Sequence, residues 1–217
     1  IVKETAFSRA PANAFSKLFD PILDNEIIRD LNITPDTKGL NASPGGACGQ
    51  IYFNAKDAEA AAAEGKDVLL VRVETSPEDI GGMAVSRGIV TCRGGMTSHA
   101  AVVARGMGCP CVSGCGEITI NEPKKTLVVN GKTLQEGDYM SIDGFTGAVY
   151  ARKIEVKPSE IMQVLEGTMR ESESTLYQDY KKFMEYVNEI KTMSVRTNAD
   201  TPKDARYAIM LGAEGIG

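Results

Sequence analysis

Tryptophan is absent from this chain of 217 residues, and histidine occurs only once. Long apolar runs are absent too, so no segment is long enough to cross a bilayer. The first residues lack the charged-then-apolar pattern of a secretory signal. The sequence therefore predicts an intracellular protein with no membrane partner.

The chain has fewer basic than acidic residues. Lysine and arginine number 24 against 29 aspartates and glutamates, which gives a formal net charge of −5. The basic residues form no run and no stripe, and these are the usual marks of a nucleic-acid-binding surface. We therefore expect no nucleic-acid partner.

Cysteine occurs five times, an odd number that does not suit the disulfide framework of a secreted domain. The dense run Cys109-Pro110-Cys111, with Cys115 close behind, invites a zinc interpretation. Zinc sites pair such a cluster with a second matched pair of ligands, and this sequence has none. We expect reduced thiols and no metal site.

Turn residues divide residues 42–150 into short elements typical of an α/β domain. The expected strands are Gly49–Asn54, Val68–Val73, Gly88–Thr91, Cys111–Val112, Thr126–Asn130, Tyr139–Ile142 and Ala148–Tyr150. The expected helices are Asp57–Glu64, Pro77–Val85 and Ser98–Gly106. Asn130-Gly131 predicts a tight hairpin between two strands.

The flanks of this domain have a different composition. Before it, the apolar pairs Ile22-Leu23 and Ile27-Ile28 suggest one or two short helices in a linker. Beyond Pro158 the pattern is helical, and one apolar stripe recurs at intervals of four and three residues. That stripe consists of Leu176, Tyr180, Phe183, Val187 and Ile190. It favours a helix packed against its neighbours over a coiled coil, because the repeat is short.

The single histidine, His99, follows two glycines and precedes a run of small residues. A lone histidine is more often a surface or hydrogen-bonded residue than a catalytic one. The glycines and alanines around it, however, would allow a large substrate close to the backbone. Thr97 can cap a helix that begins near Ser98, which puts His99 in the first turn. A phosphate on the imidazole would be stabilised there by free N–H groups and the helix dipole.

The segment from Cys92 to Gly108, which contains Gly-Gly-Met-Thr-Ser-His, resembles the phosphohistidine signature of the enzymes that make or use phosphoenolpyruvate. Within them it is most similar to the pyruvate, phosphate dikinase family. Lys38–Ile51 and Glu74–Asp79 resemble the opening of that family's central domain. Val195–Pro202 and Gly212–Gly217 resemble the start of its phosphoenolpyruvate-binding barrel.

This resemblance implies a phosphoryl relay among three domains. An ATP-grasp domain would transfer the β-phosphoryl group of ATP to His99, through a pyrophosphoryl intermediate when orthophosphate is the acceptor. A swivelling β/β/α domain would then carry the group to pyruvate, giving phosphoenolpyruvate, AMP and pyrophosphate in a reversible reaction. Neutral imidazole suits this role because it is nucleophilic near neutral pH.

The resemblance also implies roles for the neighbours of His99. Gly95, Thr97 and Ser98 are expected to bind the phosphate, with Gly95 allowing close backbone approach. Arg105, two turns along the expected helix, either contacts the phosphate or pairs with a surface carboxylate. In plant members of the family the threonine at the position of Thr97 is a regulatory phosphorylation site.

The implied organisation has four parts. Residues 1–37 would be a linker from an ATP-grasp domain, 38–155 the swivelling domain, 156–193 a helical linker, and 194–217 the start of a barrel. The chain would thus be a piece of a larger polypeptide, inactive alone. Its Mg²⁺ would bind in the other domains, and the parent would be a homodimer. The family occurs in cytoplasm, plastids and specialised organelles.

Two alternatives stay open. Phosphoenolpyruvate synthase and the first protein of the sugar phosphotransferase system use related carriers, but the synthase tends to have cysteine where this chain has Ser98. From another functional class, a non-catalytic swivelling binding module would have the same fold and an incidental His99. Phosphorylation of His99 by an ATP-grasp domain would separate these possibilities.

Overall fold

The computed structural model describes residues 9, 15 and 17–216. The chain divides into two compact units, one formed by Asp20–Lys157 and the other by Ile1–Phe19 with Pro158–Gly217. We describe each unit by itself. Within the described residues, no helix is both long enough and apolar enough to cross a membrane.

The centre of the larger unit is an eight-stranded mixed sheet. Its strands are β2 (Thr37–Lys38), β3 (Leu40–Ser43), β4 (Gly46–Tyr52), β5 (Val68–Arg72), β6 (Gly88–Thr91), β7 (Cys111–Ser113), β11 (Tyr139–Asp143) and β12 (Ala148–Tyr150). Their spatial order is β2-β12-β11-β4-β5-β6-β7-β3. The four strands β4 to β7 are parallel, whereas the remaining pairs are antiparallel.

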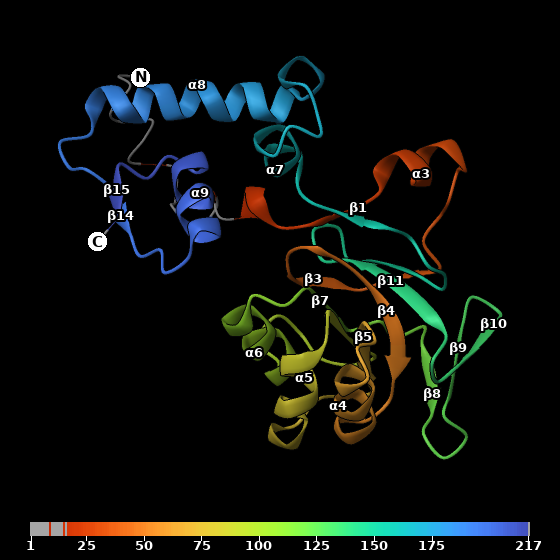
Figure 1. The fold of residues 1–217 in the computed structure, drawn as a ribbon. Coiled ribbons are helices and arrows are strands. Elements are labelled where there is room, and N and C mark those ends of the chain that lie inside the picture. The colour runs from red at the N-terminus through yellow and green to blue at the C-terminus, as the bar shows by residue number, and fades with distance from the viewer. Residues whose placement is uncertain (1–8, 10–14, 16, 217) are drawn as a thin grey trace. The chain divides into compact units, whose positions relative to one another are not determined.

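Three helices connect the parallel strands and lie together beside the sheet (Figure 1). They are α4 (Ala55–Ala63), α5 (Ile80–Val85) and α6 (His99–Met107), and the 3₁₀ turn η2 (Pro77–Asp79) leads into α5. Alanines of α4 and α6 pack with Leu70 and Ile89 of the sheet in one apolar cluster. Alanine has the highest helix propensity, and its small side chain lets these helices approach the strands closely.

The other face of the sheet packs against a small antiparallel sheet. Its strands are β8 (Thr119–Asn121), β9 (Thr126–Val129) and β10 (Lys132–Gln135). Leu127 and Val129 join Ile51, Val71 and Met140 in a second apolar cluster. Asn130 and Gly131 connect β9 to β10 with φ values of 49° and 71°, as the predicted hairpin requires. The predicted β/β/α layering is therefore confirmed.

Both ends of the larger unit are paired with each other. Strand β1 (Ile22–Leu23) is antiparallel to β13 (Val156–Lys157), and helix α3 (Asn25–Asp30) follows β1. Of the one or two short helices predicted here, α3 is present and contains Ile27 and Ile28. Ile22 and Leu23 form a strand instead, because their pairing partner lies more than 130 residues away in sequence. The expected linker 1–37 thus contributes β1, α3 and part of β2 to this unit, while residues 1–8, 10–14 and 16 lie outside the described residues.

The smaller unit is mainly helical, as its composition predicts. It contains the 3₁₀ turns η1 (Lys17–Phe19) and η3 (Glu171–Glu173) and the helices α7 (Glu160–Leu165), α8 (Thr175–Ile190) and α9 (Pro202–Met210). Two short parallel strands, β14 (Arg196–Thr197) and β15 (Gly215–Ile216), pair near its end. Phe183 and Tyr180 of the predicted stripe contact the rings of Phe15 and Phe19.

Candidate active site

His99 is the first residue of α6 and follows the loop that leaves the carboxyl end of β6. Its side chain is partly exposed. The first turn of a helix has N–H groups without intrahelical partners, and the helix dipole adds positive potential there. A negatively charged group attached to the imidazole would therefore lie in a favourable field.

Ser98 caps this helix. Its backbone is extended, with φ −64° and ψ 159°, and its Oγ accepts a hydrogen bond from the N–H of Ala101 at 3.4 Å. The prediction that Thr97 is the cap is wrong, because the helix begins one residue later than expected. Thr97 is exposed, so its hydroxyl is accessible for binding or modification.

The imidazole of His99 has one hydrogen-bond partner that the sequence did not suggest. Thr75 Oγ1 lies 3.0 Å from Nδ1 of His99. Thr75 follows the carboxyl end of β5, and His99 follows the carboxyl end of the neighbouring parallel strand β6. The carboxyl ends of adjacent parallel strands form one edge of the sheet, and this topological rule could have found the pair.

The two glycines before His99 do different things. Gly94 has φ 113°, and a Cβ there would lie 3.0 Å from Cβ and Oγ of Ser98. Gly94 is therefore required by the shape of the loop. A Cβ on Gly95 would meet nothing within 4 Å, and the residue is exposed. The space above Gly95 is open, as the expected close approach of a substrate needs.

Arg105 lies in α6 and contacts the loop that precedes His99. Its Nε donates to the carbonyl oxygen of Ala101 at 3.0 Å, and its Nη2 donates to the carbonyl oxygen of Met96. The guanidinium thus ties α6 to the loop that precedes His99. Two backbone carbonyls therefore account for its placement, and a phosphate contact by Arg105 stays a prediction.

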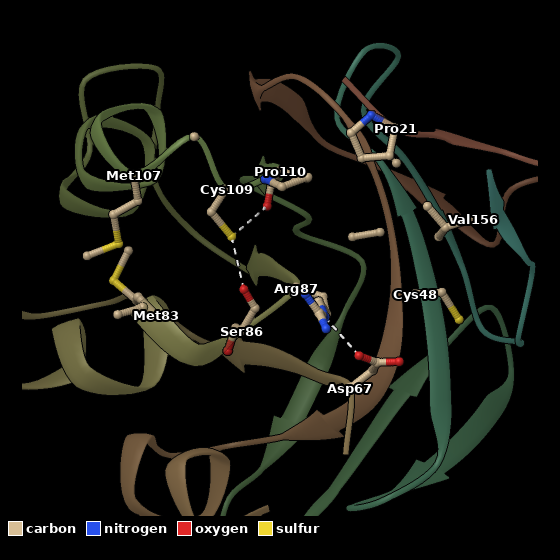
Figure 2. A pocket seen from close by; sticks show the side chains of 14 residues that line it. Pro21, Cys48, Asp67, Met83, Ser86, Arg87, Met107, Cys109, Pro110 and Val156 are labelled. Carbon is tan, nitrogen blue, oxygen red and sulfur yellow. Dashed lines mark hydrogen bonds and ion pairs between the residues drawn. The ribbon is translucent and has the colours of Figure 1, made fainter. Parts of the chain in front are cut away.

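A cavity lies at the other end of α6. It has a volume of about 470 Å³, and Figure 2 shows Met107 and Cys109 among the side chains that line it. Arg87 and Asp67 form an ion pair there at 2.8 Å. His99 does not line this cavity, and at 1.5 Å per residue the two ends of α6 are roughly 12 Å apart. The cavity is therefore distinct from the histidine site.

All five cysteines are free, and four of them are buried. Burial raises the pKa of Cys92 and of Cys111 to about 11, and that of Cys109 and of Cys115 to about 12. Thiols at such pKa values stay protonated near neutral pH and bind metals poorly. Among the described residues, no three His, Cys, Asp or Glu side chains form a cluster that could hold a metal ion.

A family model matches the part of the chain that contains the histidine site. Residues 64–147 match the family model of the PEP-utilising enzyme, mobile domain. This range contains His99, Thr75 and the whole loop between β6 and α6. Residues 64–147 therefore contain the mobile domain of the PEP-utilising enzymes. The family resemblance inferred from the sequence is confirmed.

Similar proteins cover the mobile domain and its flanks. Over all 217 residues the chain is 46% identical to pyruvate, phosphate dikinase of Clostridium symbiosum, covering 23% of that protein. It is equally similar to the enzyme of Rhizobium meliloti (strain 1021), covering 22%. Over 82% of its length it is 51% identical to the chloroplastic pyruvate, phosphate dikinase 1 of Oryza sativa subsp. japonica, covering 17%. The chain spans about a fifth of the length of these curated relatives.

Proposed function

We propose that this chain is the phosphoryl carrier domain of a pyruvate, phosphate dikinase, and that His99 is the residue that carries the phosphoryl group. The observation that supports this most directly is the contact between Nδ1 of His99 and Thr75. With Nδ1–H donating to the threonine oxygen, the lone pair of Nε2 is free for attack on phosphorus. The start of α6 supplies the positive field that the product needs.

The first step is a displacement at the β-phosphorus of ATP. The Nε2 lone pair forms the N–P bond while the bond between the β-phosphorus and the oxygen bridging to the α-phosphate breaks, so AMP leaves with that electron pair. A pyrophosphoryl group then remains on His99. An oxygen of orthophosphate attacks its terminal phosphorus while the bond from that phosphorus to the oxygen bridging to the β-phosphorus breaks. Pyrophosphate departs, and His99 keeps one phosphoryl group.

The second step transfers that group to pyruvate. Removal of a methyl proton by a base outside this chain gives the enolate, whose oxygen attacks the phosphorus. The N–P bond breaks, its electron pair returns to Nε2, and phosphoenolpyruvate forms. Each step is reversible, because a phosphoramidate and an enol phosphate are both reactive phosphoryl donors.

The remaining residues of the site act on the phosphoryl group or its access. Ser98 fixes the start of α6, and the open space at Gly95 admits the donor. Thr97 is exposed beside His99, so a regulatory phosphate on its hydroxyl would repel an incoming phosphoryl donor. Arg105 holds the loop through the carbonyl of Met96, and one of its other N–H groups can still turn toward a phosphate.

The partners of this domain would be parts of the same polypeptide. We propose an ATP-grasp domain joined through residues 1–37 and a phosphoenolpyruvate-binding barrel that starts within 194–217, with 156–193 as the helical connection. The parallel pair β14 and β15 supports a barrel start. Mg²⁺ would bind in those domains. The parent would be a homodimer in the cytoplasm, a plastid or a specialised organelle.

The test uses a separate ATP-grasp domain with β-labelled ATP and magnesium, with and without orthophosphate. We expect acid-labile, base-stable label on the chain that pyruvate removes when the barrel domain is added. If pyruvate removes the label only when orthophosphate was present, the result favours the dikinase over phosphoenolpyruvate synthase. His99→Asn should fold normally and take no label. A folded wild-type chain that stays unlabelled, beside a carrier that the same ATP-grasp domain does label, would instead favour a binding module.

A further inference from the structure

The buried carboxylate of Asp79 holds the loop that contains Thr75 through hydrogen bonds to the next residue, Ser76. Asp79 is 4% exposed, and its Oδ2 accepts hydrogen bonds from the N–H of Ser76 at 2.9 Å and from its hydroxyl at 3.4 Å. The N–H of Asp79 donates in turn to the carbonyl of Ser76 at 2.9 Å. Ser76 is the residue directly after Thr75, so these bonds fix the backbone next to the threonine that contacts His99.

A cation at the end of β5 holds the carboxylate in place. Nε of Arg72 lies 3.3 Å from Oδ1 of Asp79, and both side chains are largely buried. Arg72 is itself anchored, because its Nη1 donates to the carbonyl of Phe53 at 2.7 Å and to Glu122 at 2.9 Å. The loop that contains Thr75 therefore begins after Arg72 of β5 and is held at its other end by the ion pair between Asp79 and Arg72. A threonine on an untied loop would hold the imidazole less firmly.

We infer that Asp79 is a positioning residue for phosphoryl transfer: it holds Thr75 against Nδ1 of His99 and so keeps Nε2 unprotonated and aimed outward. This inference rests on the proposed carrier function of His99. It assigns a role to a residue that touches neither the imidazole nor the phosphoryl group. Its action passes through Ser76 and Thr75, and so through one hydrogen bond to the ring.

A purely structural role for Asp79 is the competing explanation, since it also begins a helix. The chain contains a matched control in the same unit. Asp24 is a buried carboxylate too; it caps α3 by accepting from the N–H groups of Glu26 and Ile27, and it pairs with Lys157 at 2.7 Å. Asp24→Asn therefore removes a similar buried charge at a helix start, without any link to Thr75.

The first readout is the tautomer of His99, measured by long-range ¹H–¹⁵N NMR on the unphosphorylated chain. Because the chain has one histidine, both ring nitrogens are assigned without ambiguity. We expect protonated Nδ1 and unprotonated Nε2 in the wild type and in Asp24→Asn. Asp79→Ala and Thr75→Val should shift the ring toward a mixture of tautomers. Asp79→Asn keeps one acceptor for Ser76, so it should fall between Asp79→Ala and the wild type.

The second readout is the rate of His99 phosphorylation by the ATP-grasp domain. We expect Asp79→Ala and Thr75→Val each to slow it roughly 10- to 100-fold. The double variant should be no slower than Thr75→Val alone, because both changes break one chain of contacts. Effects that multiply, or an unchanged tautomer in folded Asp79→Asn, would overturn the inference. If wild-type His99 has the expected tautomer but takes no phosphoryl group, the carrier proposal fails while the positioning of the ring stands.

Discussion

In the proposed carrier role, the hydroxyl of Thr75 would determine which nitrogen of the His99 imidazole reacts. A neutral histidine has one protonated and one unprotonated nitrogen, and only the latter attacks phosphorus. Thr75 lies within hydrogen-bond distance of Nδ1, and we propose that it favours the tautomer in which Nε2 is unprotonated. After transfer, the same oxygen can accept from Nδ1–H while Nε2 carries the phosphoryl group. One contact thus serves both the free and the phosphorylated states.

Two adjacent hydroxyls at the start of α6 have separable roles. Ser98 caps the helix through Ala101, whereas Thr97 is exposed. We expect Ser98→Ala to lower the free energy of unfolding of the larger unit by about 1 kcal/mol, the usual cost of a lost cap. Thr97→Ala should change it by less than about 0.5 kcal/mol. Urea titration followed by circular dichroism compares them, and equal losses would show that Ser98 is not the cap.

At the scale of elements, the ends of the larger unit are joined by an ion pair. Asp24 caps α3 and its carboxylate accepts from Lys157 of β13 at 2.7 Å. The hydrogen bond from Lys157, with those from Ile27 and Glu26, holds the pKa of this carboxyl below its ordinary value of 3.8 despite burial. A lowered folded-state pKa stabilises the fold above pH 3.8 and loses that effect as the pH falls below it.

The consequence is a defined pH dependence of stability. Asn also caps helices well, so Asp24→Asn removes mainly the charge. We expect it to lower the unfolding free energy by about 2 kcal/mol at pH 7, the scale of a hydrogen bond to a charged group. The difference from the wild type should shrink as the pH falls below about 4. A difference that is the same at pH 3 and pH 7, measured by chemical denaturation, would refute the ion-pair explanation.

The elements that the sequence predicts well are those with local causes. Strands β6 and β12 match their predicted bounds, and the helices α4 and α6 are shifted by one or two residues. Strand β1 was not predictable locally, because its partner β13 lies at the far end of the unit. Prediction of the site from sequence is limited in the same way, because not all of its residues are close together in the chain. His99 and its loop are contiguous in sequence, whereas Thr75 joins them only through the pairing of β5 with β6.

At the scale of the whole molecule, the chain protects its thiols by burial. Cys48 is partly exposed at the cavity at the far end of α6, and the other four cysteines are buried with pKa values raised to about 11 or 12. At pH 8 we expect one thiol per chain to react rapidly with a disulfide reagent and four to react only on unfolding. Rapid reaction of two or more thiols in the folded chain would contradict this packing.

At the scale of the whole molecule, the proposed phosphoryl relay depends on one nitrogen atom of His99. The most direct measurement is ¹⁵N and ³¹P NMR of the chain after phosphorylation by an ATP-grasp domain, since its one histidine gives one set of ring signals. The account predicts a phosphorus bonded to Nε2 of His99, with Nδ1 protonated and facing Thr75. A phosphoryl group on Nδ1, or on any residue other than His99, would contradict it.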